Sequence, residues 1–181
     1  MINWSRHTNT SLAVHQLHLQ GVIAYPTEAV WGLGCDPFSF AAVRKILHLK
    51  NRPEHKGVIL VACDWQQFAP FTEGLTGAQL GRLHQPNSKP TTWLIPHNGM
   101  APDWIVGGHD TLAVRVTTHP VAACLCRLFG GPIVSTSANP QGLSEANNAL
   151  KVRGYFGRNI DAITSGTTGS ASAPSEIRHL L

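Results

Sequence analysis

Short apolar runs alternate irregularly with segments of helical periodicity along this chain, and this alternation constrains its fold more than any other feature. The apolar runs that predict strands are residues 21–25, 29–35, 58–62, 91–95, 111–116 and 132–134, with a closing strand at 176–180. Helices are expected at residues 9–20, 40–49, 119–129 and 144–156, with two short ones in 64–85. Residues 96–110 and 164–175 are predicted to be loops. Strands and helices in this order predict an α/β fold with a mixed sheet flanked by helices.

Capping and turn residues place the boundaries of these elements. The first helix is expected to take its N-cap from one of residues 9–11 and to stop at Gly21. Pro26 should end the first strand, and Ser144 should cap the helix that runs to about residue 156.

Composition excludes several classes of protein. The 181 residues suit one domain, spanning 1–181, and with 43% apolar and 13% charged residues disorder is not expected. No apolar run approaches the about 20 residues of a membrane span, and no secretory segment follows Met1, so a cytoplasmic protein is expected. The net charge of +4 suits nucleotide or RNA partners, but it suits an ordinary basic protein equally well.

The four cysteines show no pattern of metal or redox chemistry. Cys35, Cys63, Cys124 and Cys126 form no C-x-x-C pair and have no histidine at zinc-finger spacing. The ten histidines are scattered. Buried free thiols and no metal site made by protein side chains are therefore expected.

Residues 50–57, the cation segment, carry Lys50, Arg52 and Lys56 between a helix end and a strand. Pro53 and Gly57 should keep it from being helical. Arginine presents a planar fork to phosphate oxygens and lysine a mobile charge, so the cluster is suited to hold a phosphate. The helix dipole could account for Lys50 instead, though less well for the two cations beyond the helix.

Polar groups follow two predicted strands, and an arginine lies within a third. Residues 135–139, Ser-Thr-Ser-Ala-Asn, could contact phosphate or ribose beyond a strand end, or could form an ordinary polar turn. Thr27 and Glu28 could contact a small ligand, or Glu28 could cap a helix or pair with a cation. Arg115 could face solvent or add a phosphate contact.

Several common signatures are missing from the sequence. It contains no G-x-x-x-x-G-K-[ST] phosphate loop and no G-x-S-x-G elbow of a serine hydrolase. The pair Gly32 and Gly34 lacks the third glycine of a dinucleotide fingerprint. The aromatic residues of an RNA-recognition motif are also lacking.

Ordered blocks across nearly the whole chain resemble the YrdC/TsaC family, in its short bacterial form. These blocks are residues 25–36, the K-x-R pair with a following Lys-Gly at Lys50, Arg52, Lys56 and Gly57, and residues 112–116, 135–139 and 174–178. The resemblance implies a YrdC-like α/β sheet curved around a positively charged cavity.

The resemblance also implies an activity, the ATP-dependent synthesis of L-threonylcarbamoyl-AMP. The substrates would be L-threonine, bicarbonate or CO2, and ATP with Mg²⁺, and pyrophosphate would be released by this nucleotidyltransferase. The product would serve, through threonylcarbamoyl-transferase proteins, the modification of the adenosine next to the anticodon in tRNAs that read codons beginning with A. A tRNA or double-stranded RNA could be a further partner.

The resemblance assigns roles to individual residues, and residues 164–175 could close over the substrates. The expected catalytic residues are Lys50 and Arg52. The expected ATP contacts are Lys50, Arg52, Lys56, Arg115, Ser137 and Asn139, and the expected threonine contacts are Thr27, Ser135 and Ser175.

Two departures from the family pattern stand out. Residues 87–90, Asn-Ser-Lys-Pro, replace the usual Trp-Pro-Gly-Pro, although Thr92 keeps the family threonine. Glu176 stands where longer forms often have Thr.

Two other interpretations stay open: a non-catalytic RNA-binding protein of tRNA or ribosome maturation, and a carbamoyl-transfer module like that of hydrogenase-maturation proteins. The second lacks the accompanying acylphosphatase-like and zinc-finger segments.

Overall fold

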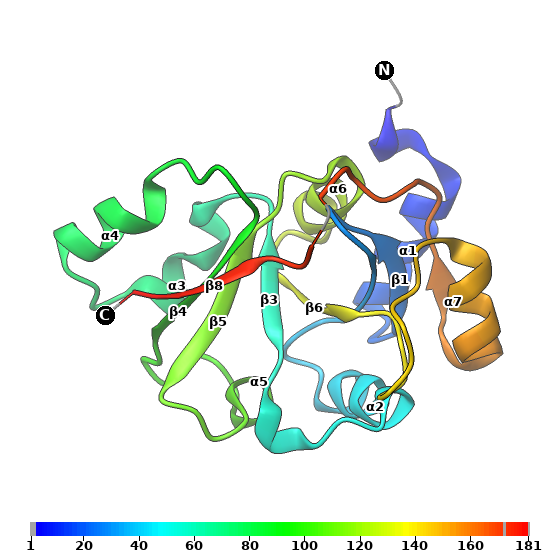
Figure 1. Cartoon of the computed structure of the whole chain (residues 1–181), viewed down its shortest axis with the longest axis horizontal. Coiled ribbons are helices and arrows are strands. Elements are labelled where there is room, and N and C mark those ends of the chain that lie inside the picture. The colour runs from blue at the N-terminus through cyan, green and yellow to red at the C-terminus, as the bar shows by residue number, and fades with distance from the viewer. Residues whose placement is uncertain (1–2, 172, 181) are drawn as a thin grey trace.

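Eight strands form one mixed sheet in the computed structural model, which describes residues 3–171 and 173–180 (Figure 1). The strand order is β7-β1-β2-β6-β3-β5-β4-β8. The strands are β1 (Ile23–Pro26), β2 (Trp31–Gly34), β3 (Ile59–Ala62), β4 (Thr91–Pro96), β5 (Thr111–Val116), β6 (Ile133–Ser137), β7 (Ala162–Ile163) and β8 (Glu176–His179). Three neighbouring pairs are parallel and the others antiparallel, which confirms the predicted mixed α/β sheet.

Helices cover both faces of the sheet. The α-helices are α1 (Thr8–His18), α2 (Phe40–Lys50), α3 (Ala69–Thr72), α4 (Gly77–His84), α5 (Asp103–Val106), α6 (Pro120–Phe129) and α7 (Ala149–Phe156). Short 3-10 turns are η1 (Trp4–Arg6), η2 (Glu54–Lys56), η3 (Trp65–Phe68) and η4 (Gly157–Asn159). None of the described helices combines the length and the apolarity needed to cross a membrane.

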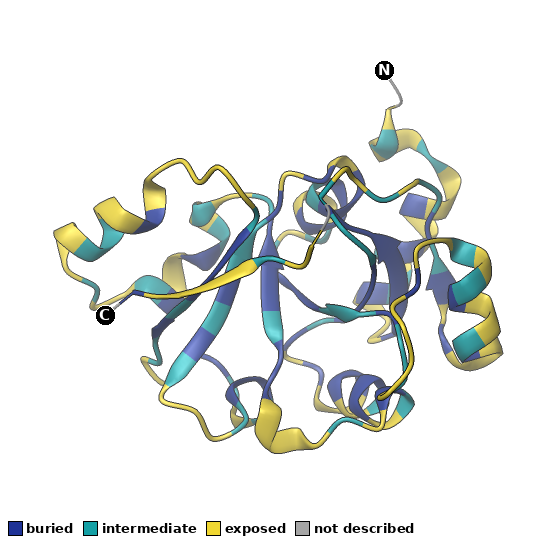
Figure 2. Cartoon of the chain, viewed as in Figure 1, coloured by how far each residue is buried: buried dark blue, intermediate teal, exposed yellow. Residues whose placement is uncertain are grey.

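The core divides into two layers because side chains alternate between the faces of each strand. In β3, Val61 packs into the layer under α1 and α6. Its neighbours Leu60 and Ala62 pack into the larger layer, which includes residues of α2, α5 and α7. Figure 2 shows the central strands buried and β8 exposed at the sheet edge.

Local sequence signals correctly predicted α2, whose end delivers the cation segment. The Ser39 hydroxyl accepts a hydrogen bond from the Ala42 N–H at 3.3 Å and so caps the helix. At the other end, Asn51 takes a left-handed conformation with φ of 52°. That conformation stops the helix directly after Lys50.

Two predicted helix boundaries were wrong, whereas β1 ends at Pro26 as predicted. Helix α1 begins at Thr8 after His7, and Gln20, not Gly21, takes the positive φ of 61° beyond its end. Helix α7 begins at Ala149 because Asn148, not Ser144, accepts the capping bond from the Lys151 N–H at 2.8 Å.

Short elements escaped the sequence analysis. The predicted loop 96–110 contains α5, and the two-residue strand β7 was not expected. The cation segment is not free of helix, because residues 54–56 form the 3-10 turn η2. Strand β6 continues through the predicted polar turn to Ser137, where it pairs with β2. These elements depend on tertiary pairing, which short-range patterns do not record.

The cysteines are free, as predicted, and Cys35, Cys124 and Cys126 are buried, whereas Cys63 is only half-buried. No disulfide links the four thiols.

The predicted loop 164–175, of which residue 172 lies outside the described residues, connects β7 to β8 at opposite edges of the sheet. We call residues 164–171 and 173–175 the crossing loop. Its Gly169 N–H donates to Thr27 O at 2.9 Å, and its Ala171 N–H donates to Glu28 O at 3.0 Å. A Cβ at Gly169 would lie 2.8 Å from Glu28 O, so only glycine permits this close approach.

Candidate active site

A pocket of about 250 Å³, the inner pocket, gathers most of the residues that the sequence singled out. Among the expected site residues it is lined by Thr27, Arg52, Arg115, Ser135, Ser137 and Ser175. They come from the ends of β1, β5 and β6, from the segment after α2 and from the crossing loop. The sheet therefore brings together residues that are far apart in the chain.

A larger cavity of about 690 Å³, the outer cavity, adjoins the inner pocket. Pro174 lines both. The outer cavity is also lined by Glu28, Lys89, His119 and Gly169. The crossing loop thus contributes walls to both spaces.

The ammonium of Lys50 lies beneath the end of β6. Its Nζ donates to Ser137 O, to Asn139 O at 2.7 Å and to Asn139 Oδ1 at 3.3 Å. Lys50 is buried, with 5% of its surface exposed. Burial, and next the nearby Arg52 charge, lower the pKa of Lys50 to about 8. All three N–H bonds of the ammonium are therefore used to hold residues 137–139.

Arg52 and Lys56 behave differently within the cation segment. Arg52 Nε and Nη2 donate to Gly57 O at 3.1 and 2.9 Å, and burial lowers the pKa of this guanidinium. Arg52 lines the inner pocket, whereas Lys56 is exposed and is not among the described residues that line it. Gly57 has a φ of +55°, and a Cβ there would lie 2.8 Å from Ile105 O, so this turn requires glycine.

The polar residues after β1 and β6 are held by local hydrogen bonds. The Ser137 hydroxyl donates to Asn139 Oδ1 at 2.7 Å, and Asn139 Nδ2 donates to Leu143 O at 2.6 Å. The Thr27 hydroxyl donates to Val30 O at 2.7 Å. Asn139 does not line the inner pocket among the described residues, but it fixes Ser137, which does.

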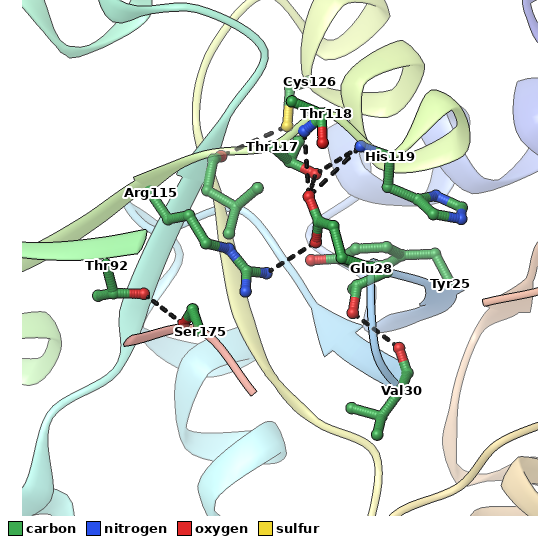
Figure 3. A network of polar contacts seen from close by, with 12 residues as sticks. Tyr25, Glu28, Val30, Thr92, Arg115, Thr117, Thr118, His119, Cys126 and Ser175 are labelled. Atoms are coloured by element: carbon green, nitrogen blue, oxygen red, sulfur yellow. Dashed lines mark hydrogen bonds and ion pairs between the residues drawn. The ribbon is translucent and has the colours of Figure 1, made fainter. Parts of the chain in front are cut away.

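Figure 3 shows a network centred on Glu28 and Arg115. Glu28 Oε2 lies 3.7 Å from Arg115 Nη2, and both side chains are only 11% exposed. Glu28 Oε1 accepts hydrogen bonds from the Thr117 hydroxyl at 2.6 Å and from the Thr118 N–H at 3.0 Å. Burial alone would raise the pKa of Glu28, but Arg115 and these hydrogen bonds lower it below its ordinary value. Glu28 therefore pairs with a cation and also holds the turn that precedes α6, and Arg115 faces the pocket and not the solvent.

Ser175 is tied to the strand that carries the family threonine. Its hydroxyl lies 2.7 Å from the Thr92 hydroxyl, as Figure 3 shows. Beside it, the Glu176 N–H donates to Pro90 O at 2.9 Å. The unusual residues 87–90 thus still lead into a strand paired with β8, and Lys89 lies exposed at the outer cavity.

Sequence reasoning missed other residues of this site. The buried His119 places its Nε2 3.0 Å from Thr167 O of the crossing loop, and burial lowers the pKa of this imidazole. Thr117 is buried against Glu28, and Glu145 lines the inner pocket. Thr117 and His119 directly follow β5, so polar residues after a strand that carries a charge were the available signal.

No group of three or more His, Cys, Asp or Glu side chains comes together as a metal site in residues 3–171 and 173–180.

Comparisons with known proteins agree with this architecture. The family model of Sua5, YciO and YrdC proteins, described as telomere recombination, matches residues 15–181. A threonylcarbamoyl-AMP synthase of Cellvibrio japonicus is 54% identical over 181 residues, which are 100% of this chain and 96% of that protein. A threonylcarbamoyl-AMP synthase of Saccharophagus degradans is 48% identical over 180 residues, with 99% of this chain and 94% of that protein covered.

Solved structures share the fold. P. abyssi Sua5 complexed with L-threonine matches with a TM-score of 0.84 and 28% identity, over 94% of this chain and 50% of that one. This chain thus spans about half the length of that Sua5. E. coli YciO matches with a TM-score of 0.78 over 94% of this chain and 82% of its own, and at 21% identity it shows the fold alone. The chain belongs to the Sua5/YciO/YrdC family, which confirms the resemblance seen in its sequence.

Proposed function

We propose that this protein synthesises L-threonylcarbamoyl-AMP from L-threonine, bicarbonate or CO2, and Mg–ATP, with release of pyrophosphate. The observation that carries the proposal is the inner pocket, where Arg52 and Arg115 face the hydroxyls of Ser135 and Ser137. Relatives that bear the name threonylcarbamoyl-AMP synthase, and a Sua5 structure complexed with L-threonine, support the same activity.

The reaction joins threonine to AMP through a carbamate. The threonine amine takes up CO2 and gives up a proton to water, and an oxygen of the resulting carbamate then attacks the α-phosphorus of ATP. The bond from the α-phosphorus to the bridging oxygen breaks, and Mg-pyrophosphate leaves with the electron pair. Such a nucleotidyl transfer requires positioning and neutralisation of charge more than a covalent nucleophile.

In this proposal the four cations have different roles in positioning the phosphates and neutralising their charge. Arg52 and Arg115 hold the phosphates and stabilise the charge that develops on them, because both guanidinium groups border the inner pocket. Lys50 supports the same phosphates through residues 137–139, which its ammonium holds. Lys56 is exposed, and we assign it an outer contact to the triphosphate.

The hydroxyl groups complete the proposed site. Ser137 and Asn139 position the nucleotide, and Thr27, Ser135 and Ser175 line the part of the pocket that takes threonine. The inner pocket of about 250 Å³ is too small for ATP and threonine together, so the substrates extend into the outer cavity of about 690 Å³. The crossing loop covers them there.

We further propose that residues 1–181 act as one domain in the cytoplasm. The product would pass to proteins that transfer the threonylcarbamoyl group to tRNA. Exposed Lys56 and Lys89 could add a contact to RNA, because cations at the surface attract phosphates over a distance. A non-catalytic RNA-binding role is less well supported, because the polar residues line a pocket of small-molecule size.

Pyrophosphate release tests the proposed function. Purified protein is expected to convert ATP to pyrophosphate only when threonine and bicarbonate are both present. Omission of either substrate, and replacement of threonine by serine or alanine, are the controls. Pyrophosphate release that ignores threonine would contradict the assignment. Tight RNA binding without any release would favour the RNA-binding alternative.

A further inference from the structure

Glu28 occupies an unusual position, because it is a buried carboxylate beside a site that must bind anions. It follows Thr27, which lines the inner pocket, and its own side chain lines the outer cavity. A negative charge there repels phosphate groups, so Glu28 is expected to have a structural role that offsets this repulsion.

One carboxylate oxygen of Glu28 is held firmly by the protein. Oε1 accepts the Thr117 hydroxyl at 2.6 Å, the Thr118 N–H at 3.0 Å and the His119 N–H at 3.3 Å. These donors belong to the turn between β5 and α6. The backbone of Glu28 is held as well, since its carbonyl accepts the Ala171 N–H at 3.0 Å. The carboxylate therefore has little freedom to move.

The other oxygen of Glu28 meets only Arg115. Oε2 lies 3.7 Å from Arg115 Nη2 and has no hydrogen-bond partner among the described residues. Arg115 Nε is likewise buried without a partner in this part of the chain, and no other hydrogen bond from the guanidinium is seen there. Charge attraction alone holds the guanidinium, which leaves its terminal N–H groups available to a ligand.

Arg52 provides a contrast within the same pocket. Its guanidinium donates to the carbonyls of Gly57 and Lys56, so part of its fork is used by the protein. Arg115 donates to no such carbonyl among the described residues, and without Glu28 a guanidinium that is only 11% exposed would have no charge there to compensate for its burial.

We propose that Glu28 is a positioning residue, which holds the Arg115 guanidinium by charge so that its N–H groups point to the transferring phosphate. The proposal rests on the proposed synthesis of L-threonylcarbamoyl-AMP. It assigns Glu28 no contact with the reacting atoms. Glu28 lowers the positive potential felt by bound ATP but keeps Arg115 in the geometry that the transition state needs.

If Glu28 positions Arg115, loss of the Glu28 charge should lower kcat without raising the KM for ATP. Glu28→Gln keeps an oxygen that can accept the bonds from Thr117, Thr118 and His119, yet removes the charge. We expect kcat to fall by about tenfold, because Arg115 is no longer held in position. The KM for ATP should not rise, because a negative charge near the phosphates has also been removed. General structural damage would instead raise KM and lower the fraction of folded enzyme.

A double-mutant cycle tests whether Glu28 acts through Arg115. In an Arg115→Gln background, the further change Glu28→Gln should alter kcat by no more than about twofold. Glu73→Gln is the matched control, because Glu73 is exposed, lines neither the inner pocket nor the outer cavity, and should leave kcat unchanged. Wild-type kcat in Glu28→Gln, or an equal loss in both backgrounds, would overturn the proposal.

Thermal unfolding of the wild type, the two single variants and the double variant separates the role of Glu28 from the proposed activity. Each single variant leaves one buried charge uncompensated and should melt below the wild type, while the double variant should melt no lower than the less stable single variant. Additive losses in melting temperature would show that Glu28 does not hold Arg115, whatever the reaction is. Absence of threonine-dependent pyrophosphate release from the wild type would contradict the proposed function alone.

Discussion

Lys50 and Arg115 are both buried cations of the candidate active site, but the protein holds them in opposite ways. The Lys50 ammonium donates to Ser137 O and to two oxygens of Asn139, and no carboxylate pairs with it among the described residues. The Arg115 guanidinium pairs with Glu28 and donates no side-chain hydrogen bond to the described chain.

The difference indicates what each cation does. A cation whose N–H groups are all used by backbone and amide oxygens shapes the turn that carries those oxygens. A cation held by charge alone keeps its donors for a ligand. In this protein Lys50 therefore builds the wall of the inner pocket formed by residues 137–139, and we propose that Arg115 is the group that meets the substrate.

Removal of the Lys50 ammonium should reduce the rate of pyrophosphate release more than the changes described below. Lys50→Ala removes the ammonium that donates to Ser137 O and Asn139 O, and should cut threonine-dependent pyrophosphate release at least about tenfold. Arg52→Ala is expected to cause a loss of similar size through the phosphates directly. Steady-state pyrophosphate assays with circular dichroism as a folding control measure both, and near-wild-type turnover in the two variants would place the site elsewhere.

The pH dependence of kcat/KM should report the titration of the Lys50 ammonium. The pKa of Lys50 is lowered to about 8 by burial and by Arg52, so its ammonium loses a proton as the pH rises through that value. The neutral amine has one N–H fewer and cannot hold all three oxygens, so kcat/KM for ATP should fall above about pH 8. The negative charge of Glu145 raises the pKa of Lys50, but by less than burial and Arg52 lower it.

A Lys50→Arg variant serves as the control for this pH profile, because a guanidinium stays charged throughout the range. Its kcat/KM is expected to lack the decline above about pH 8, whatever its absolute value. The same alkaline decline in Lys50→Arg would assign the titration to another group.

Substitution of Lys89 should change the kinetics least. This side chain is exposed and is held neither by an ion pair nor by a side-chain hydrogen bond to the described residues. Lys89→Gly restores the family residue at this position. We expect the KM for ATP to rise by no more than about threefold, on the scale of one exposed charge. Titration of ATP at saturating threonine measures it, and a loss as large as that of Lys50→Ala would make Lys89 a main phosphate contact.

Much of the fold could be predicted from short-range patterns. The apolar runs and caps predicted α2, α6 and most strands, because each lies in a segment with consistent periodicity and clear boundaries. Boundaries failed where two capping residues competed, as Ser144 and Asn148 did before α7. The strand β7 and the helix α5 failed because they are too short to show a period.

The candidate site was predictable in part for the same reason. The cation segment and residues 135–139 stand out as local clusters, and Arg115 stands out as a charge within a predicted strand. The family blocks added Ser175 to them. Thr117 and His119 were missed, because their roles depend on Glu28, which lies about ninety positions away in the chain.

The sequence by itself determined the fold class, the family and the residue types that gather around the inner pocket, because periodicity, turns and ordered motifs are written locally in the chain. Only the tertiary structure decided which oxygen each cation meets. Lys50 and Arg115 carry the same charge in the sequence, but β6 brings carbonyls to one and β1 brings a carboxylate to the other. The direction and the partners of a buried charge depend on strand pairing between distant segments, which no local pattern encodes.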